Sequence, residues 1–135
     1  MAGGSAMNLL LDTAAFLWLC AGTEQLSSAA ASALADQANT VSVSAVTAWE
    51  IGLKAARGKL KLPAPVETWF PAMIQHHRLD LLAIEAATAI ASTRLPAVHA
   101  DPFDRLLVAT ACERGLWLIT PDTLIAKYPN VQTLW

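Results

Sequence analysis

The sequence predicts a single α/β domain with a mainly parallel sheet and helices on both faces. Short apolar segments that suit buried strands alternate with helix-favouring, often alanine-rich segments along the chain. The length of 135 residues suits one domain with a substantial core. Hydrophobic residues make up 55% of the chain and charged residues 15%, so most elements should be buried on more than one face or at an interface.

The first half of the chain predicts two strands separated by helices. The apolar run "MNLLLD" (7–12) is typical of a buried strand, and the alternating, β-branched "TVSVS" (40–44) predicts a second strand. "TAAFLWLCAG" ends on Gly22, as a short helix does, and Ser27 or Ser28 suits the cap of the next helix. The predicted helices of this half are 13–22, 27–39, 45–59 with a stop at Gly58, and, after the connector 62–65, 66–77.

The second half continues the same alternation. In "DPFDRLLVATACERG", Asp101 suits the helix cap, Pro102 the first helical position and Gly115 the end of the helix. The predicted strands are 79–84, 116–120 and 131–135. The predicted helices are 85–95 and 101–115, with a loop over 96–100 between them, and a helical turn or short helix over 121–129.

The composition excludes several classes of protein. Charged residues interrupt the apolar stretches before they reach membrane-spanning length, so no membrane association is expected. Residues 1–6 lack the positive charge of a secretory signal and are expected to be a flexible or added leader before a domain over 7–135, with Met7 as the natural start. Cys20 and Cys112 predict buried free thiols and a reducing cytoplasm. The net charge of −2 gives no general attraction to nucleic acid.

Four acids follow successive predicted elements: Asp12, Glu50, Asp104 and Asp122. Taken singly, Asp12 and Asp122 suit helix caps, Asp104 suits the helix dipole, and Glu50 suits a solvent-facing charge. The carboxyl ends of parallel strands share one edge, so together the acids predict a cluster there, which Glu50 reaches if its helix leans over that edge. Such a cluster favours a bound cation, and oxygen ligands favour Mg²⁺ or Mn²⁺ over zinc.

Five segments carry a resemblance to a known family: "LLLDTAAFLW", "SAVTAWEIGLKAARGKL", "HADPFDRLLVATA", "LITPD" and "VQTLW". In this order they resemble a PIN-domain ribonuclease of the VapC toxin type, and the similarity runs from Met7 to Trp135. "DPFDRLL" is similar to the branch that is usually encoded beside a Phd/YefM-like antitoxin. The resemblance implies a PIN-like three-layer α/β/α fold and a Mg²⁺- or Mn²⁺-dependent endoribonuclease, the toxin of a type II toxin–antitoxin system. The branch usually has a histidine where this chain has Ala14.

The resemblance also implies the roles of the acids. The family's acidic positions fall on Asp12, Glu50, Asp104 and Asp122, which we expect to be catalytic and metal-binding. Asp12 and Asp104 are expected to be the main ligands, and Asp122 a second-metal or water-mediated ligand. Glu50 either completes the site or helps to deprotonate water. Asp104 matches the third acid better than Asp101, which is left as a cap and a secondary group near the metal.

Local positive charge is expected to hold the RNA. The basic residues after the Glu50 helix are Lys54, Arg57, Lys59 and Lys61, although an ordinary solvated helix end explains them equally well. Arg105 can contact phosphate, but an ion pair with an acid of the cluster is the favoured prediction.

Several other polar residues have a structural alternative. Thr13 and Thr120 can hydrogen-bond the carboxylates, but as β-branched residues at strand ends they favour packing. The histidines lack metal-ligand spacing and are predicted to be loop or surface residues: His76, His77 and His99.

The aromatic residues and the high apolar fraction bear on partners. Trp18, Trp49 and Trp69 can form a groove for an antitoxin helix, but core packing is favoured. The apolar fraction also predicts a homodimer. Two alternative functions remain. A catalytically inactive PIN-like binding module is kept open by Ala14, and a phosphate-handling enzyme is opposed by the lack of a second acid beside Asp12 and of a lysine in "LWLITPD".

Overall fold

The computed structural model describes residues 6–135, so the predicted leader lies outside the described residues except for Ala6. Five strands form one sheet in the order β3–β2–β1–β4–β5. They are β1 (Asn8–Leu11), β2 (Thr40–Ser44), β3 (Asp80–Leu82), β4 (Trp117–Ile119) and β5 (Gln132–Leu134). Every neighbouring pair is parallel, which confirms the predicted α/β class and places the carboxyl ends of all five strands along one edge.

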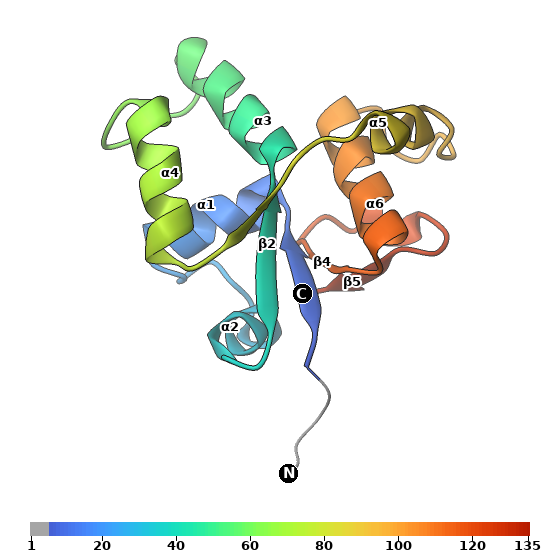
Figure 1. The fold of residues 1–135 in the computed structure, drawn as a ribbon, viewed down its shortest axis with the longest axis horizontal. Helices are drawn as coiled ribbons and strands as arrows, with labels where there is room; N and C mark the ends of the chain where they lie inside the picture. Colours follow the sequence, from blue (N-terminus) through green and yellow to red (C-terminus); the bar gives the residue numbers. More distant parts are fainter. Residues whose placement is uncertain (1–5) are drawn as a thin grey trace.

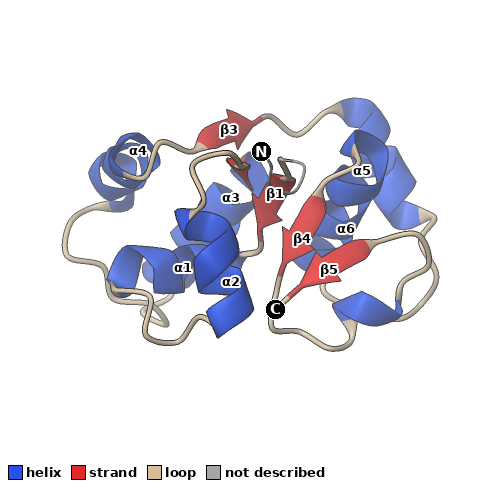
Figure 2. Ribbon diagram, turned by 90° about the horizontal axis from the view of Figure 1, so that it is seen from below, coloured by secondary structure: helices blue, strands red, loops and turns tan. Residues whose placement is uncertain are grey.

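Helices cover both faces of the sheet. They are α1 (Thr13–Ala21), α2 (Ser28–Ala35), α3 (Ala45–Ala56), α4 (Val66–His76), α5 (Ala86–Thr93), α6 (Pro102–Arg114) and the short 3₁₀ helix η1 (Ile125–Lys127). Helices α1, α2 and α4 lie on one side of the central strands, and α5 and α6 lie on the other (Figures 1 and 2). Helix α3 follows β2 directly and contacts both α4 and α6.

Strand β1 divides the core into two parts. Leu9 and Leu11 face a cluster that includes Phe16 of α1, whereas Leu10 faces a cluster that includes Leu107 of α6. Successive strand residues point to opposite faces of a sheet, and all three leucines are fully buried. The apolar run that predicted a buried strand is therefore the central strand of the sheet, flanked by β2 and β4.

Side-chain caps fix several helix starts as predicted. Asp101 Oδ1 accepts the Phe103 N–H at 2.9 Å, and Ser27 Oγ accepts the Ala30 N–H at 3.0 Å. The predicted helix over 27–39 was too long, because α2 ends at Ala35 and the chain then turns. The Asn39 side chain stabilises this turn by donating to the Ala33 carbonyl and accepting the Met7 N–H.

The tryptophans and cysteines differ in burial. Trp69 packs in the core against Phe16, as predicted, but Trp49 is 50% exposed and packs edge-on against Phe103. Cys20 and Cys112 are free thiols, as predicted, although both are half-buried rather than fully buried. Within residues 6–135, no helix combines the length and the apolar character that crossing a bilayer requires.

Candidate active site

One cleft brings together the four acids. It has a volume of about 270 Å³ and lies at the carboxyl edge of the sheet. Its lining residues are Asp12, Thr13, Ala14, Leu17, Glu50, Lys54, Asp101, Asp104, Pro121 and Asp122. The predicted convergence of the acids is therefore present in the structure, and each acid reaches the cleft from a different element.

Asp12 follows β1 and has two structural tasks. Its Oδ1 accepts the Ala15 N–H at 2.7 Å, which caps α1, and its Oδ2 accepts the Thr120 hydroxyl at 2.6 Å. The side chain is almost fully buried, with 5% exposure. Asp12 is therefore both the cap of α1 and a member of the acidic cluster, because its two carboxylate oxygens have different partners.

Glu50 reaches the cleft from the second turn of α3. It is 5% exposed, and its Oε1 accepts the Thr13 hydroxyl at 2.7 Å. The Thr13 hydroxyl also lies 3.1 Å from that of Thr47, another buried residue of α3. The solvent-facing alternative for Glu50 is therefore wrong.

The two threonines beside the acids do more than pack. We expected packing for Thr13 and Thr120, but both hydroxyls donate to carboxylates of the cleft. Both residues are also buried, so the hydroxyl bonds and the packing occur together.

Asp101 and Asp104 occupy the positions at the start of α6 that the sequence predicted. Asp101 caps the helix, and Asp104 lies in its first turn, on the cleft. Asp101 lines the cleft as well, so it stands close enough to influence its neighbour.

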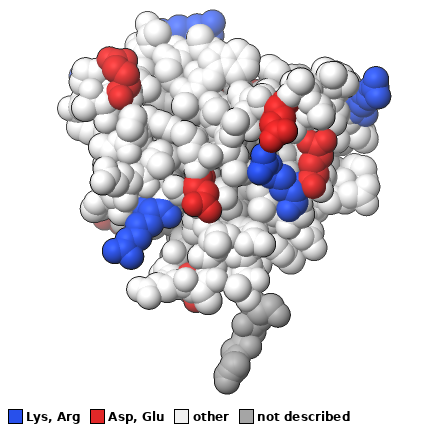
Figure 3. Space-filling view, viewed as in Figure 1, with Lys and Arg blue, Asp and Glu red and all other residues white. Residues whose placement is uncertain are grey.

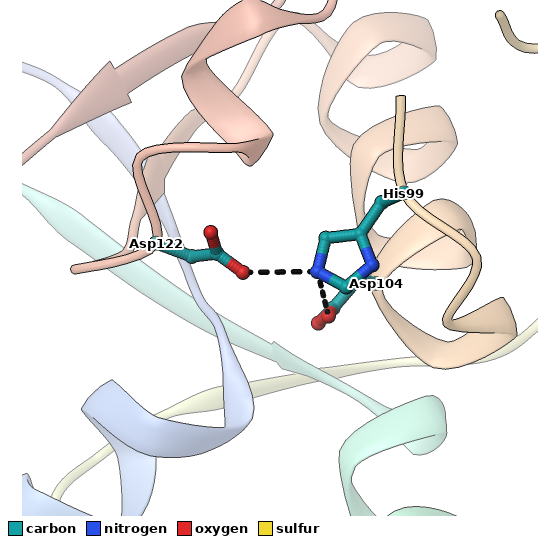
Figure 4. A group of neighbouring side chains, drawn as sticks. All are labelled: His99, Asp104 and Asp122. Carbon is teal, nitrogen blue, oxygen red and sulfur yellow. Dashed lines mark hydrogen bonds and ion pairs between the residues drawn. The ribbon is translucent and has the colours of Figure 1, made fainter. Parts of the chain in front are cut away.

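His99 lies in a loop, as predicted, but it also belongs to this cluster, which the prediction missed. Its Nε2 lies 3.1 Å from Asp122 Oδ2 and 3.2 Å from Asp104 Oδ2, and the three side chains converge from the loop before α6, from α6 itself and from the loop after β4 (Figure 4). Their ligand atoms lie within 4.8 Å of one another. The residue spacing gave no metal-site signal. The position of His99 could have indicated its proximity to Asp104, because it lies two residues before the Asp101 cap in the loop that leads to the helix of Asp104.

The electrostatics of the cluster favour protons or a cation. Burial raises the pKa of Asp104 to about 7, and the charges of Asp101, Glu50 and Asp12 raise it as well, while His99 lowers it. Burial also raises the pKa of Asp12 to about 6, although the hydrogen bonds from Thr120 and from the Ala15 N–H oppose this rise. The carboxylates therefore destabilise one another's charged forms, and a bound cation would relieve that repulsion.

The basic residues occupy different places. Lys54 lines the cleft and forms an ion pair with Glu50 one turn earlier on α3. The other basic residues of this region are exposed at and beyond the end of α3, and none forms a salt bridge among residues 6–135: Arg57, Lys59 and Lys61. Elsewhere, the face shown in Figure 3 carries scattered charges on a largely uncharged surface.

Arg105 does not pair with an acid of the cluster, so this prediction was wrong. Its guanidinium nitrogens donate to the carbonyls of Leu95 at 2.8 Å, Pro96 at 2.9 Å and Ser92 at 3.0 Å. A longer bond of 3.3 Å reaches the His99 carbonyl. The side chain thus ties the α5–α6 connection to α6.

Comparisons with known proteins agree with this architecture. The model of the PIN domain family matches residues 9–131. The chain is 34% identical over 131 residues to "Ribonuclease VapC22" of Mycobacterium tuberculosis, and the match covers 94% of this chain and 98% of that protein.

Solved structures show the same fold at low sequence identity. VapBC2 from Rickettsia felis, bound to a promoter DNA fragment, has a TM-score of 0.70 at 16% identity, covering 96% of this chain and 99% of that chain. DNA-bound VapBC from Salmonella typhimurium has a TM-score of 0.68 at 16% identity, covering 95% and 97%. FitAcB from Neisseria gonorrhoeae has a TM-score of 0.60 at 20% identity, covering 94% and 96%.

Proposed function

Because the chain belongs to the PIN domain family, we propose that it is a VapC-type ribonuclease, the toxin of a type II toxin–antitoxin system. The observation that carries this proposal is the convergence of four acids in one cleft at the carboxyl edge of the sheet. The identity to a relative named as a ribonuclease supports RNA as the substrate. The proposed reaction is hydrolysis of RNA phosphodiester bonds.

The donor set fits Mg²⁺ or Mn²⁺. Carboxylate oxygens are the ligands that these ions prefer, and the pKa values of Asp12 and Asp104 are raised chiefly by burial and also by the neighbouring acids, so a cation would stabilise their charged forms. In the proposed site Asp12 and Asp104 are the main ligands, Asp122 binds a second ion or acts through water, and Glu50 completes the site. When bound, the metal would offset the negative charge that develops on the phosphoryl group and activate the attacking water.

Other residues of the chain restrain the acids of this site and supply the positive charge beside it. Thr120 and the α1 cap restrain both oxygens of Asp12, and Thr13 restrains Glu50. Glu50 is the proposed acceptor for the proton of the attacking water where it is not a ligand. Lys54, at the same cleft, is the proposed first contact for an RNA phosphate, followed by Arg57 and Lys59.

Partners follow from the same proposal. VapBC-5 from Mycobacterium tuberculosis, whose solved structure is similar at 18% identity, is a member of the VapBC family of toxin–antitoxin systems. The proposed partner here is a Phd/YefM-like antitoxin that places a basic side chain beside the acids. A homodimer is proposed because large apolar side chains are exposed, namely Trp49, Leu81, Ile84, Ile90, Leu124 and Trp135. The proposed compartment is the cytoplasm, where the two free thiols would stay reduced.

A cleavage assay tests the activity. Purified protein should cut a fluorophore–quencher RNA when Mn²⁺ or Mg²⁺ is added and should stop when EDTA is added. Asp12→Asn should abolish cleavage, whereas Asp80→Asn, an exposed acid on β3, should cleave like the wild type. Cleavage that persists in EDTA or in Asp12→Asn would contradict the proposed site. RNA binding without cleavage would instead identify the inactive binding module that Ala14 leaves open.

A second experiment tests the partner. The protein is co-expressed with the product of the small reading frame beside its gene, purified through a tag on that product, and assayed for cleavage. We expect a complex that cleaves RNA only after the partner is removed. A partner that neither binds nor suppresses cleavage would contradict the toxin assignment, and a monomer in light scattering would contradict the homodimer.

A further inference from the structure

The two ring nitrogens of His99 have different partners. Nδ1 lies 3.2 Å from the backbone nitrogen of Asp101, whose N–H donates to it. A ring nitrogen that accepts a hydrogen bond carries no proton, so the proton of the neutral ring is on Nε2. The Nε2–H then donates to Asp122 Oδ2 at 3.1 Å, with Asp104 Oδ2 at 3.2 Å (Figure 4).

The backbone of His99 is held as firmly as its ring. Its N–H donates to the Tyr128 hydroxyl at 2.9 Å, and its carbonyl accepts from that hydroxyl and from Arg105, each at 3.3 Å. Tyr128 is buried, and Arg105 is fixed by the carbonyl of Ser92 near the end of α5 and by two further carbonyls of the same loop. These bonds hold the imidazole against Asp104 and Asp122 from a preformed support.

Asp122 depends on this support. It lies in the irregular segment after β4, where its Oδ1 accepts the Leu124 N–H at 2.8 Å and its N–H donates to the Thr120 hydroxyl at 3.1 Å. These two bonds shape the turn, and they leave Oδ2 to be directed by the His99 Nε2–H. Without that donor, Oδ2 has no hydrogen-bond partner among the described residues.

We propose that His99 is a positioning residue of the active site, which donates its Nε2–H to hold Asp122 toward Asp104 and does not itself bind the metal. This inference rests on the proposed metal-dependent function. A protonated Nε2 has no lone pair to offer to a cation, and Nδ1 is occupied by the Asp101 N–H. His99 would therefore raise metal affinity by fixing the carboxylates around the ion.

Two substitutions of His99 distinguish the effect of its hydrogen-bond donor from the effect of its bulk. His99→Gln keeps an N–H donor of similar reach, whereas His99→Leu keeps the bulk and removes the donor. Isothermal titration of Mn²⁺ should show affinity about tenfold weaker for His99→Leu. His99→Gln should recover most of the wild-type affinity. Tyr128→Phe, which removes the hydroxyl that holds the His99 backbone, should shift affinity in the same direction by less. His76→Gln, a histidine of α4, should leave affinity unchanged.

Nitrogen NMR of the three histidines reads the tautomer directly in the metal-free protein. The His99 signals, assigned by their loss in His99→Gln, should show the Nε2–H pattern and keep it when Mg²⁺ is added. A proton on Nδ1, a metal-ligated ring, or a His99→Leu variant that is folded and binds Mn²⁺ like the wild type would overturn the proposal. If His99→Leu is unfolded, an unchanged affinity of Tyr128→Phe would overturn it.

These outcomes are distinct from failure of the proposed function. The tautomer and the Mn²⁺ affinity are measured without RNA, so a protein that passes both tests but does not cleave RNA contradicts only the nuclease activity. Normal metal-dependent cleavage with a changed tautomer contradicts only the role of His99. Absence of any Mn²⁺ binding in the wild type would overturn both the metal site and the role of His99 within it.

Discussion

Thr120 donates its hydroxyl to Asp12 Oδ2 at 2.6 Å, across 108 residues of sequence. The register of the sheet explains this bond. Leu11, the last residue of β1, lies opposite Ile119, the last residue of β4, and Asp12 and Thr120 follow them directly. The same hydroxyl accepts the Asp122 N–H at 3.1 Å. One side chain thus orients two of the four acids.

Thr120→Val should therefore destabilise the protein and impair the site. The substitution keeps the shape and removes a hydrogen bond to a buried carboxylate, with an expected loss of about 2 kcal/mol in the free energy of unfolding. Cleavage should fall as well, because Asp12 loses its restraint. Urea denaturation and the RNA assay measure both effects. Thr133→Val on β5 is the matched control, since its hydroxyl makes no side-chain hydrogen bond within residues 6–135; an equal effect of both variants would contradict the role of Thr120.

Asp104→Asn should abolish cleavage without destabilising the protein, and it should stabilise the metal-free form because it removes a buried charge from the repelling cluster. Asp101→Ala should instead cost about 1 kcal/mol of stability through the lost helix cap and leave part of the activity. Thermal melts and cleavage rates of the two variants test this division. The reverse pattern would show that their roles are exchanged.

Mn²⁺ should raise the melting temperature of the wild type, because an ion that binds only the folded state stabilises it. At a hundredfold excess over the dissociation constant the gain would be about 2.7 kcal/mol. Asp12→Asn should lose this gain, whereas Asp80→Asn should keep it. Scanning fluorimetry with and without millimolar Mn²⁺ makes the comparison, and equal melting temperatures in the wild type would argue against the metal site.

The stability of the metal-free protein should increase as pH falls from about 8 to about 5. The pKa values of Asp12 and Asp104 are raised to about 6 and about 7 in the folded state, so the folded state binds these protons more tightly than the unfolded chain. Their contribution is fully present below the ordinary aspartate pKa of 3.8 and is lost as pH rises through 6 and 7. Denaturation in EDTA across this range measures the slope, and Asp104→Asn should flatten it. A slope that is the same in both proteins would contradict the shifted pKa of Asp104.

Lys54→Met should weaken RNA binding, because Lys54 is the basic residue that lines the cleft. The binding constant should fall and its dependence on salt should become less steep, since one phosphate contact is lost. Fluorescence anisotropy at two salt concentrations gives both values, in EDTA to exclude cleavage. Lys127→Met in η1 serves as the control, and equal salt slopes for the two variants would place the RNA elsewhere.

The sequence predicted the elements and the acidic cluster because both depend on local patterns. Apolar runs, together with glycine and aspartate residues that mark the ends and starts of helices, located the strands and helices. Parallel strands bring their carboxyl ends to one edge of the sheet whatever the details of packing. The positions of Asp12, Asp104 and Asp122 at that edge followed from their places after β1, at the start of α6 and after β4.

The contacts around the cluster were not predictable in this way because they depend on tertiary packing. Whether the Thr120 hydroxyl reaches an acid depends on the register between β1 and β4, which no local pattern specifies. His99 reaches Asp104 and Asp122 because Tyr128 and Arg105 hold its loop, and Arg105 is unavailable to the acids for the same reason. Where a side chain has several possible partners, the tertiary structure decides which contact forms, and the neighbouring residues in sequence do not.

The strand order has a consequence for the timing of toxicity during synthesis. The central strand β1 is translated long before its sheet neighbour β4 and before Asp122, the acid that follows β4. A nascent chain that ends before residue 122 lacks an acid of the cleft and the partner of His99. The cleft therefore stays incomplete until Asp122 has been translated, and the proposed activity arises only after that point.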